Sequence, residues 1–111
     1  MITTHILDLS LGKPAAGVRV VLASIEDGQR TTIASGVTDV DGRLRDLFPK
    51  GRKLDAAIYE LAFETGPYFV ARGATPFHPR VTVTFEITDP EEHYHVPLLI
   101  SPFGYTTYRG S

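Results

Sequence analysis

Histidine is the side chain best suited to proton transfer near neutral pH, and this 111-residue chain has four histidines, at positions 5, 78, 93 and 95. His5 falls in the β-like segment 2–8, and His93 and His95 fall in the segment 93–101. Side chains alternate along a strand, so His93 and His95 share a face, opposite the apolar stripe of residues 94, 96, 98 and 100. In the first segment, residues 2, 4 and 6 take one face and His5 takes the other. We therefore expect His5 and His95 to point away from the hydrophobic core.

Several interpretations of these histidines are compatible with their spacing. They could be partly exposed strand residues without a role, or they could act as a general acid and base. A third interpretation is a metal site, because a His-X-His pair in a strand presents two imidazoles on one side and His5 could supply a third. No carboxylate occupies an obvious completing position for such a zinc-like triad, and we expect no metal.

The segment 39–43 reads Asp-Val-Asp-Gly-Arg and resembles the opening of a calcium loop. It lacks the bidentate acid that such a loop requires, so it predicts a tight turn instead. Arg43 would then leave the turn at the start of a strand, where a guanidinium can present its planar fork to an anionic or carbonyl-rich ligand. Arg45 and Arg52 could do the same, and composition alone does not choose among the three arginines.

The segment 108–111 brings a phenol, a guanidinium and a terminal carboxylate into four residues, Tyr108, Arg109, Gly110 and Ser111. Chain ends commonly fray, but the β-like segment 105–109 leads directly into this tail and indicates that it is held in place. Other chemistries lack their motifs in this chain. There is no Gly-X-Ser-X-Gly elbow for a serine nucleophile, no phosphate-binding glycine loop and no dinucleotide fingerprint.

The elements that must position these residues are short and separated by frequent turns, which is typical of an all-β sandwich. Because there is no room for repeated crossover helices, we expect antiparallel pairing within a single domain over residues 1–111. One short helix is predicted at 67–73, which begins with proline and ends with glycine. The predicted strands are 2–8, 18–25, 31–38, 57–64, 80–88, 93–101 and 105–109, with a short eighth near 44–47.

Composition narrows the partners and the compartment. The net charge is −2 and the hydrophobic fraction is 42%, which suggests neither a nucleic acid nor an anionic membrane as a partner. The chain has no cysteine, which excludes disulfides, thiolate zinc sites and cysteine nucleophiles and suits a reducing compartment. The N-terminus does not read as a signal peptide, and no apolar run approaches the ~20 residues that span a bilayer. We expect a cytoplasmic protein.

Five blocks of the sequence resemble, in order, successive blocks of the 5-hydroxyisourate hydrolases, which are transthyretin-like proteins. The most specific are His-Tyr-His-Val-Pro-Leu-Leu at 93–99 and the ending Tyr-Arg-Gly-Ser at 108–111. The blocks at 4–8, 12–15 and 38–43 are weaker alone and useful in this order. The resemblance covers nearly the whole chain.

This resemblance implies a transthyretin-like sandwich of two four-stranded sheets with one short helix. It also implies a homotetramer, built as a dimer of dimers, with active sites at the dimer–dimer interface and no cofactor. The implied reaction opens 5-hydroxyisourate to 2-oxo-4-hydroxy-4-carboxy-5-ureidoimidazoline, on the route from urate to allantoin. The essential residues of the family fall here on His5, Arg43, His95 and the terminal tetrapeptide.

The chemistry of these side chains suggests a separate role for each of them. Water is a poor nucleophile, so we expect the His5/His95 pair, with His95 preferred, to remove its proton. Arg43 would orient the substrate and stabilise negative charge on its oxygen, while Ser111 and Tyr108 hold substrate or water. Arg109 could contact the ligand or pair with the terminal carboxylate. The alternatives are a transthyretin-like carrier of a small ligand without catalysis, and a β-sandwich interaction domain.

Overall fold

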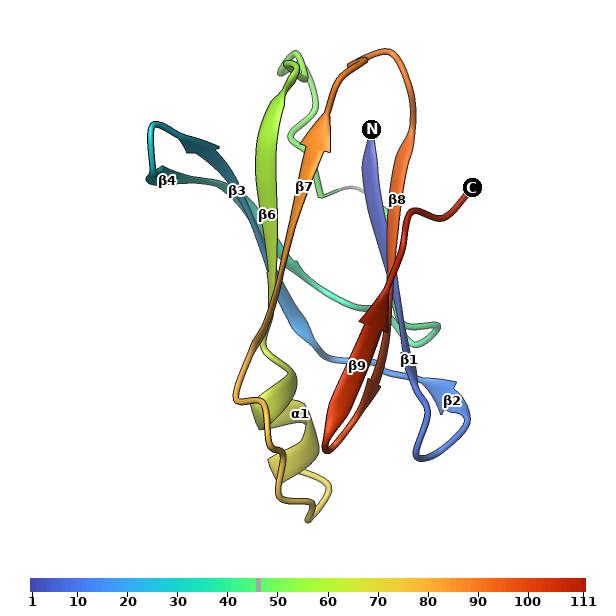
Figure 1. The fold of residues 1–111 in the computed structure, drawn as a ribbon. Helices are drawn as coiled ribbons and strands as arrows, with labels where there is room; N and C mark the ends of the chain where they lie inside the picture. The colour runs from blue at the N-terminus through green and yellow to red at the C-terminus, as the bar shows by residue number, and fades with distance from the viewer. Residues whose placement is uncertain (46) are drawn as a thin grey trace.

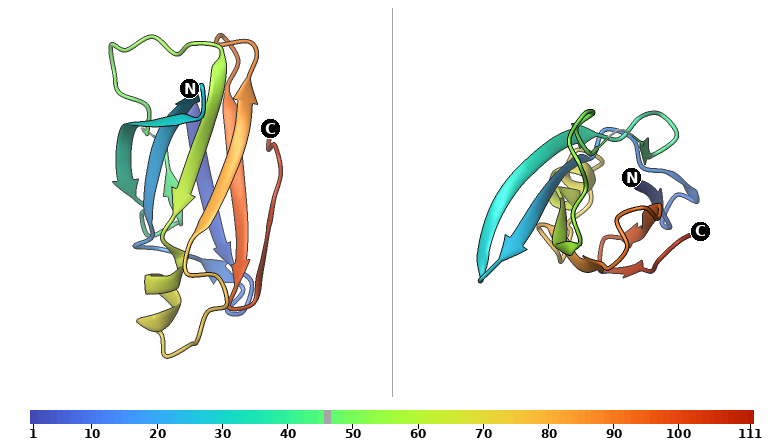
Figure 2. Two further views of the ribbon diagram at one scale, coloured as in Figure 1. Left: turned by 60° about the vertical axis from the view of Figure 1, so that its left-hand side comes forward. Right: turned by 90° about the horizontal axis from the view of Figure 1, so that it is seen from above.

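Two β-sheets face each other across the hydrophobic core in the computed structural model, which describes residues 1–45 and 47–111 (Figures 1 and 2). The first sheet has four antiparallel strands in the order β4-β3-β6-β7. In the second sheet, β1 lies beside β8, and β8 lies beside β9, while two short strands, β2 and β5, pair with β1. The first sheet contains β3 (Arg19–Glu26), β4 (Gln29–Val37), β6 (Ala57–Phe63) and β7 (Val81–Ile87). The second contains β1 (Ile2–Asp8), β2 (Lys13–Pro14), β5 (Arg43–Leu44), β8 (Tyr94–Ser101) and β9 (Gly104–Thr107).

The strand predictions are confirmed to within two residues at each end for all seven main segments. The predicted eighth strand, 44–47, appears as β5 at Arg43–Leu44. Position 46 of the predicted range lies outside the described residues. The helix α1 spans Thr65–Val70, so it begins two residues earlier and ends three residues earlier than the predicted range 67–73. The C-cap residue Ala71 still donates its N–H to the carbonyl of Pro67.

One pairing differs from the antiparallel arrangement that short connections favour. Strands β1 and β8 run parallel, with Ile2 opposite Tyr94 and Asp8 opposite Ile100. The antiparallel expectation applies to strands joined by a hairpin, whereas these two strands come from opposite ends of the chain. The second sheet also has five strands instead of the expected four, because β2 has only two residues and is too short to show an alternating pattern.

The alternation of burial along the strands places the core where the sequence predicts it. Ile2 and Ile6 of β1 are fully buried in the core cluster, which also contains Tyr94, Val96 and other alternate residues of β8. His5 and His95 are only partly buried and lie on the opposite faces of these strands. The prediction that both histidines point away from the core is therefore confirmed. Among the described residues, no helix is long and apolar enough to cross a membrane.

Candidate active site

The outer face of β1 brings the candidate residues together, because β1 has a neighbouring strand on each side. On one side β5 places Arg43 opposite His5, and on the other side β8 places His95 opposite Thr3. Side chains that lie opposite each other on adjacent strands have Cβ atoms about 5 Å apart. Three segments that are distant in the sequence thus present two imidazoles, one guanidinium and one hydroxyl on a single face of the sheet.

The turn before Arg43 is tight, as the sequence predicts, and it aims β5 at β1. The carboxylate of Asp39 accepts hydrogen bonds from the backbone N–H groups of Asp41 and Arg43, each at 2.9 Å. These bonds hold the pKa of Asp39 below its ordinary value, with the bond from Arg43 as the largest cause. Gly42 has a φ of +73°, and a Cβ at this position would collide with the carbonyl oxygen of Ile6. Glycine therefore allows the turn to pack directly on β1.

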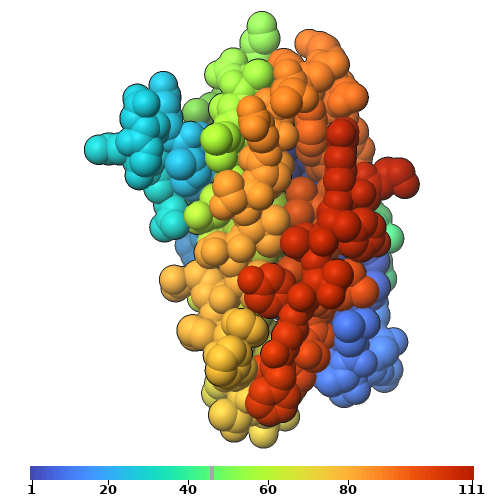
Figure 3. All heavy atoms as spheres, in the orientation of Figure 1, coloured from blue at the N-terminus to red at the C-terminus, as the bar shows by residue number. Residues whose placement is uncertain are grey.

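The tail after β9 is held along β8, so it does not fray. The register that pairs Leu98 with Thr107 also fits the isolated bridge between His95 and Gly110. Pro97 lies between these two points and has no N–H to donate, so the ladder is interrupted there. The hydroxyl of Thr107 donates to the carbonyl of Pro97 at 2.8 Å, and the N–H of Gly110 donates to the carbonyl of His95 at 2.8 Å. Figure 3 shows the C-terminal segment running along the surface of the preceding strand.

Two hollows that share His95 and Ser111 form the candidate site. One is about 430 Å³ in volume and is bordered also by Arg43 and Thr3. The other is about 220 Å³ and is bordered also by His5 and Tyr108. The structure thus brings His5, Arg43, His95, Tyr108 and Ser111 around two adjoining hollows on the outer face of the sheet, which together are called the groove below.

The same geometry distinguishes the three arginines that could meet a ligand. Arg43 and Arg45 both border the larger hollow, whereas Arg52 borders a different depression near β6. Arg43 is the one that is partly buried and fixed by strand pairing opposite His5. It is therefore the arginine best placed to meet a ligand in the groove.

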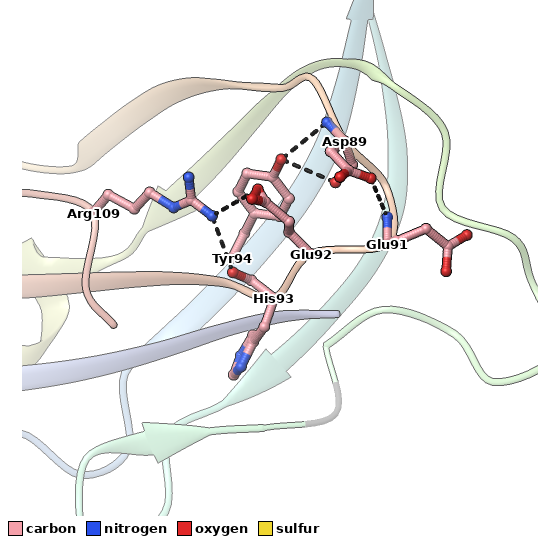
Figure 4. A network of polar contacts seen from close by, with 6 residues as sticks. All are labelled: Asp89, Glu91, Glu92, His93, Tyr94 and Arg109. Atoms are coloured by element: carbon pink, nitrogen blue, oxygen red, sulfur yellow. Dashed lines mark hydrogen bonds and ion pairs between the residues drawn. The ribbon is translucent and has the colours of Figure 1, made fainter.

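Arg109 does not border either of the two hollows. Alternation along the tail turns it to the face opposite Tyr108 and Gly110, where its guanidinium lies 4.4 Å from the ring centroid of Tyr94. Its Nη2 is 3.4 Å from a carboxylate oxygen of Glu92 and 3.4 Å from the carbonyl oxygen of His93 (Figure 4). The geometry favours a role for Arg109 in fastening the tail to β8.

The pKa values of the two groove histidines are lowered by partly different causes. Burial, the charge of Arg43 and the charges of His93 and His5 all lower the pKa of His95 below its ordinary value of 6.5. Burial and the charge of Arg43 also lower the pKa of His5, but the nearby backbone carbonyl of Asp41 and the negative charges of Asp39 and Asp41 oppose them. Both imidazoles are therefore neutral at pH 7, and His95 is the one with no opposing influence. A neutral imidazole can accept a proton, as a general base must.

Thr3 and His93 border the groove, but sequence reasoning gave Thr3 no role. The hydroxyl of Thr3 lies 2.8 Å from Nδ1 of His95 and 2.8 Å from Nε2 of His93. Alternation does place Thr3 on the same face as His5, and this is the one feature of the local sequence that indicates a role for Thr3. Within residues 1–45 and 47–111, no three histidine or carboxylate side chains are arranged to hold a metal ion.

Gly110 is the point where the tail touches the His95 ring. A Cβ at position 110 would lie 2.6 Å from Cδ2 of His95 and 3.2 Å from Cγ of Pro97. We predict that Gly110→Ala displaces the imidazole and shifts its ring resonances in NMR spectra. Gly104→Ala is the matched control, because a Cβ at position 104 meets nothing within 4 Å. Equal, small shifts in the two variants would contradict this close packing.

The profile of the HIUase/transthyretin family matches residues 2–110 of this chain. A 5-hydroxyisourate hydrolase of Halalkalibacterium halodurans is 48% identical over 115 residues, covering 99% of this chain and 97% of the relative. The structure of Klebsiella pneumoniae 5-hydroxyisourate hydrolase is similar with a TM-score of 0.85 and 42% identity, covering 99% of this chain and 98% of the other. Sea bream transthyretin, solved in complex with thyroxine, has a TM-score of 0.90 and 38% identity, covering 98% and 93%. The chain therefore belongs to the HIUase/transthyretin family.

Proposed function

We propose that this protein is an enzyme that hydrolyses 5-hydroxyisourate to 2-oxo-4-hydroxy-4-carboxy-5-ureidoimidazoline. The observation that carries the proposal is the convergence of a neutral, partly buried His95 with His5, Arg43 and Ser111 in one groove. Its full-length relatives in Halalkalibacterium halodurans and Klebsiella pneumoniae are both named 5-hydroxyisourate hydrolases. The reaction needs a base, a stabiliser of negative charge and a binding surface, and this groove offers all three.

The chemical step begins with proton removal from water. Because Thr3 holds Nδ1 of His95, only Nε2 is free to accept that proton. The water oxygen then forms a bond to a ring carbonyl carbon, and the carbonyl oxygen becomes an oxyanion. Collapse of this intermediate breaks the C–N bond, and the protonated His95 returns its proton to the departing nitrogen. A positioned base of this kind accelerates a reaction by roughly 10²- to 10⁴-fold.

The other groove residues bind and orient in this scheme. Arg43 is always charged and its fork can bind the substrate's carbonyl oxygens, so it stabilises the oxyanion. Strand pairing places His5 opposite Arg43, where its ring can hold the substrate. Tyr108 and Ser111 supply hydroxyl groups at the His95 end of the groove. No step uses a metal or an organic cofactor.

Ligand carriage without catalysis is the competing function, and overall fold does not decide between the two. The sea bream transthyretin that was solved with thyroxine has a TM-score of 0.90, and the Klebsiella pneumoniae hydrolase has 0.85. The distinction therefore rests on the side chains that line the groove. Two neutral imidazoles beside a guanidinium are suited to proton transfer onto a polar substrate, which favours hydrolysis.

We also propose that the active protein is a homotetramer, built as a dimer of dimers, whose assembly closes the groove. His5, Arg43 and His95 are each only partly buried in the single chain, and Tyr108 is 57% exposed. A second copy over this face would exclude water and strengthen every electrostatic interaction in the site. Light scattering after size exclusion should give four times the 12.2 kDa chain mass. A fully active monomer would contradict this proposal.

The cytoplasmic location stays a prediction from the sequence.

The direct test of function is a hydrolysis assay. 5-Hydroxyisourate is generated with urate oxidase, and the decay of its ultraviolet absorbance is followed with and without the protein. We expect the wild type to accelerate the decay well above the spontaneous rate, and His95→Asn to lose at least about 100-fold of that acceleration. His78→Asn is the matched control, because His78 packs between the rings of Phe77 and Tyr105 and does not border the groove. Wild-type protein without any effect on the decay would refute the function.

The pH dependence follows from the lowered pKa of His95. A general base works only when unprotonated, so kcat/KM should fall as pH drops through a value below 6.5 and stay level above it. Arg43 is a cause of the lowered pKa, so Arg43→Gln should move this acidic limb to higher pH while also reducing the rate. Arg30→Gln, which removes an exposed partner of Glu60, should leave the limb in place. An acidic limb that does not move in Arg43→Gln would argue against His95 as the base.

A further inference from the structure

The hydroxyl of Thr3 lies between two imidazoles and contacts both. Its Oγ1 is 2.8 Å from Nδ1 of His95 and 2.8 Å from Nε2 of His93, while Thr3 itself is only 6% exposed. The parallel register of β1 and β8 produces this contact by placing Thr3 directly opposite His95. In Figure 4 the His93 imidazole points away from Arg109, whose hydrogen bond to His93 is with the backbone carbonyl oxygen.

Counting protons restricts how these three groups can bond. A threonine hydroxyl carries a single proton, so it can donate to only one of the two ring nitrogens. The other ring nitrogen must then carry a proton and donate it to the hydroxyl oxygen. If the hydroxyl donates to one ring and accepts from the other, two neutral imidazoles allow two arrangements, which differ in whether Nδ1 or Nε2 of His95 bears the hydrogen.

The charge in the groove favours one of these arrangements. Arg43 borders the same hollow as His95 and acts on it electrostatically. A guanidinium attracts the lone pair of a ring nitrogen and repels an N–H that points into the groove. The favoured arrangement therefore has the proton on Nδ1, bonded to Thr3, and leaves the lone pair of Nε2 in the groove.

We propose that Thr3 and His93 are positioning residues that fix His95 in the Nδ1–H tautomer, through a chain of hydrogen bonds from His95 to Thr3 to His93. In this chain Nδ1–H of His95 donates to Oγ1 of Thr3, and the Thr3 hydroxyl donates to Nε2 of His93. The role of these hydrogen bonds in the reaction rests on the proposed hydrolase function, whereas the hydrogen bonds themselves are a property of the folded protein.

The hydrogen bonds from His95 to Thr3 and His93 have a defined consequence when His95 takes a proton. The proton from water binds Nε2, and the resulting imidazolium keeps its Nδ1–H bond to Thr3. That bond then becomes charge-assisted and stronger, so the network stabilises the protonated base at the moment it forms. The opposite tautomer would present an N–H to the water and could not accept its proton.

The tautomer can be measured without any turnover. Two-bond ¹H–¹⁵N correlations of histidine-labelled wild-type protein distinguish a protonated Nδ1 from a protonated Nε2. We expect His95 to carry its proton on Nδ1 above its pKa, and Thr3→Val to produce a mixture of both tautomers. Thr3→Ser retains a hydroxyl and should restore the Nδ1–H form. A wild-type His95 protonated on Nε2 would overturn the proposal.

Kinetics of the same variants separate positioning from general damage to the fold. Thr3→Val should lower kcat roughly tenfold with KM changed less than about twofold, the effect of losing one hydrogen bond that orients the base. Thr4→Val is the matched control in the same strand, because the Thr4 hydroxyl donates instead to the carbonyl of Val96 and not to a histidine. It should lower stability while leaving the His95 tautomer and kcat unchanged.

Variants of His93 test the far end of the chain. His93→Gln keeps an acceptor oxygen at the place of Nε2 and should retain the tautomer, whereas His93→Leu removes the acceptor and should lower kcat. Unchanged tautomer and kcat in both Thr3→Val and His93→Leu would overturn the proposal. An inactive wild type whose His95 still shows the Nδ1–H form would refute the proposed function and leave the hydrogen-bond chain intact.

Discussion

The register of β1 with β5 and β8 is the constraint on which the site depends. It sets His5 opposite Arg43 and Thr3 opposite His95, so one strand aligns groups from positions that are up to 92 residues apart. Because side chains alternate, a slip of one residue would turn the histidine face inward and the apolar face outward. Burial of Ile2 and Ile6 prevents this slip, since it would transfer two fully buried side chains to water. The core thus fixes the geometry of a site that lies outside it.

Pro97 and Gly110 impose a second constraint, on the tail. Proline removes one donor from the edge that faces β9, so the tail leaves the ladder after Thr107 and returns to it at Gly110. Only glycine fits at the return point, because any Cβ would press on the His95 ring. Packing of the tail at Gly110 therefore limits how the His95 imidazole can turn.

One sandwich supports different functions within this family, since similar structures include a hydrolase and a transthyretin solved with thyroxine. The physical reason is that the two faces of the second sheet have different roles. The inner face carries the stabilising apolar contacts, and the outer face is free to vary without loss of the core. In this chain the outer face carries His5 and His95, whose pKa values are lowered by partial burial and by the charge of Arg43.

Local sequence determined the strands, the turn before Arg43 and the faces that carry His5 and His95, because alternation and turn chemistry act over a few residues. Resemblance to known hydrolases then pointed to the residues of the site. The parallel pairing of β1 with β8, the contact of Thr3 with two imidazoles and the contact of Arg109 with the Tyr94 ring were decided only by the tertiary structure. Each of them depends on which distant strand lies alongside and in what register, and that is fixed by packing of the whole core.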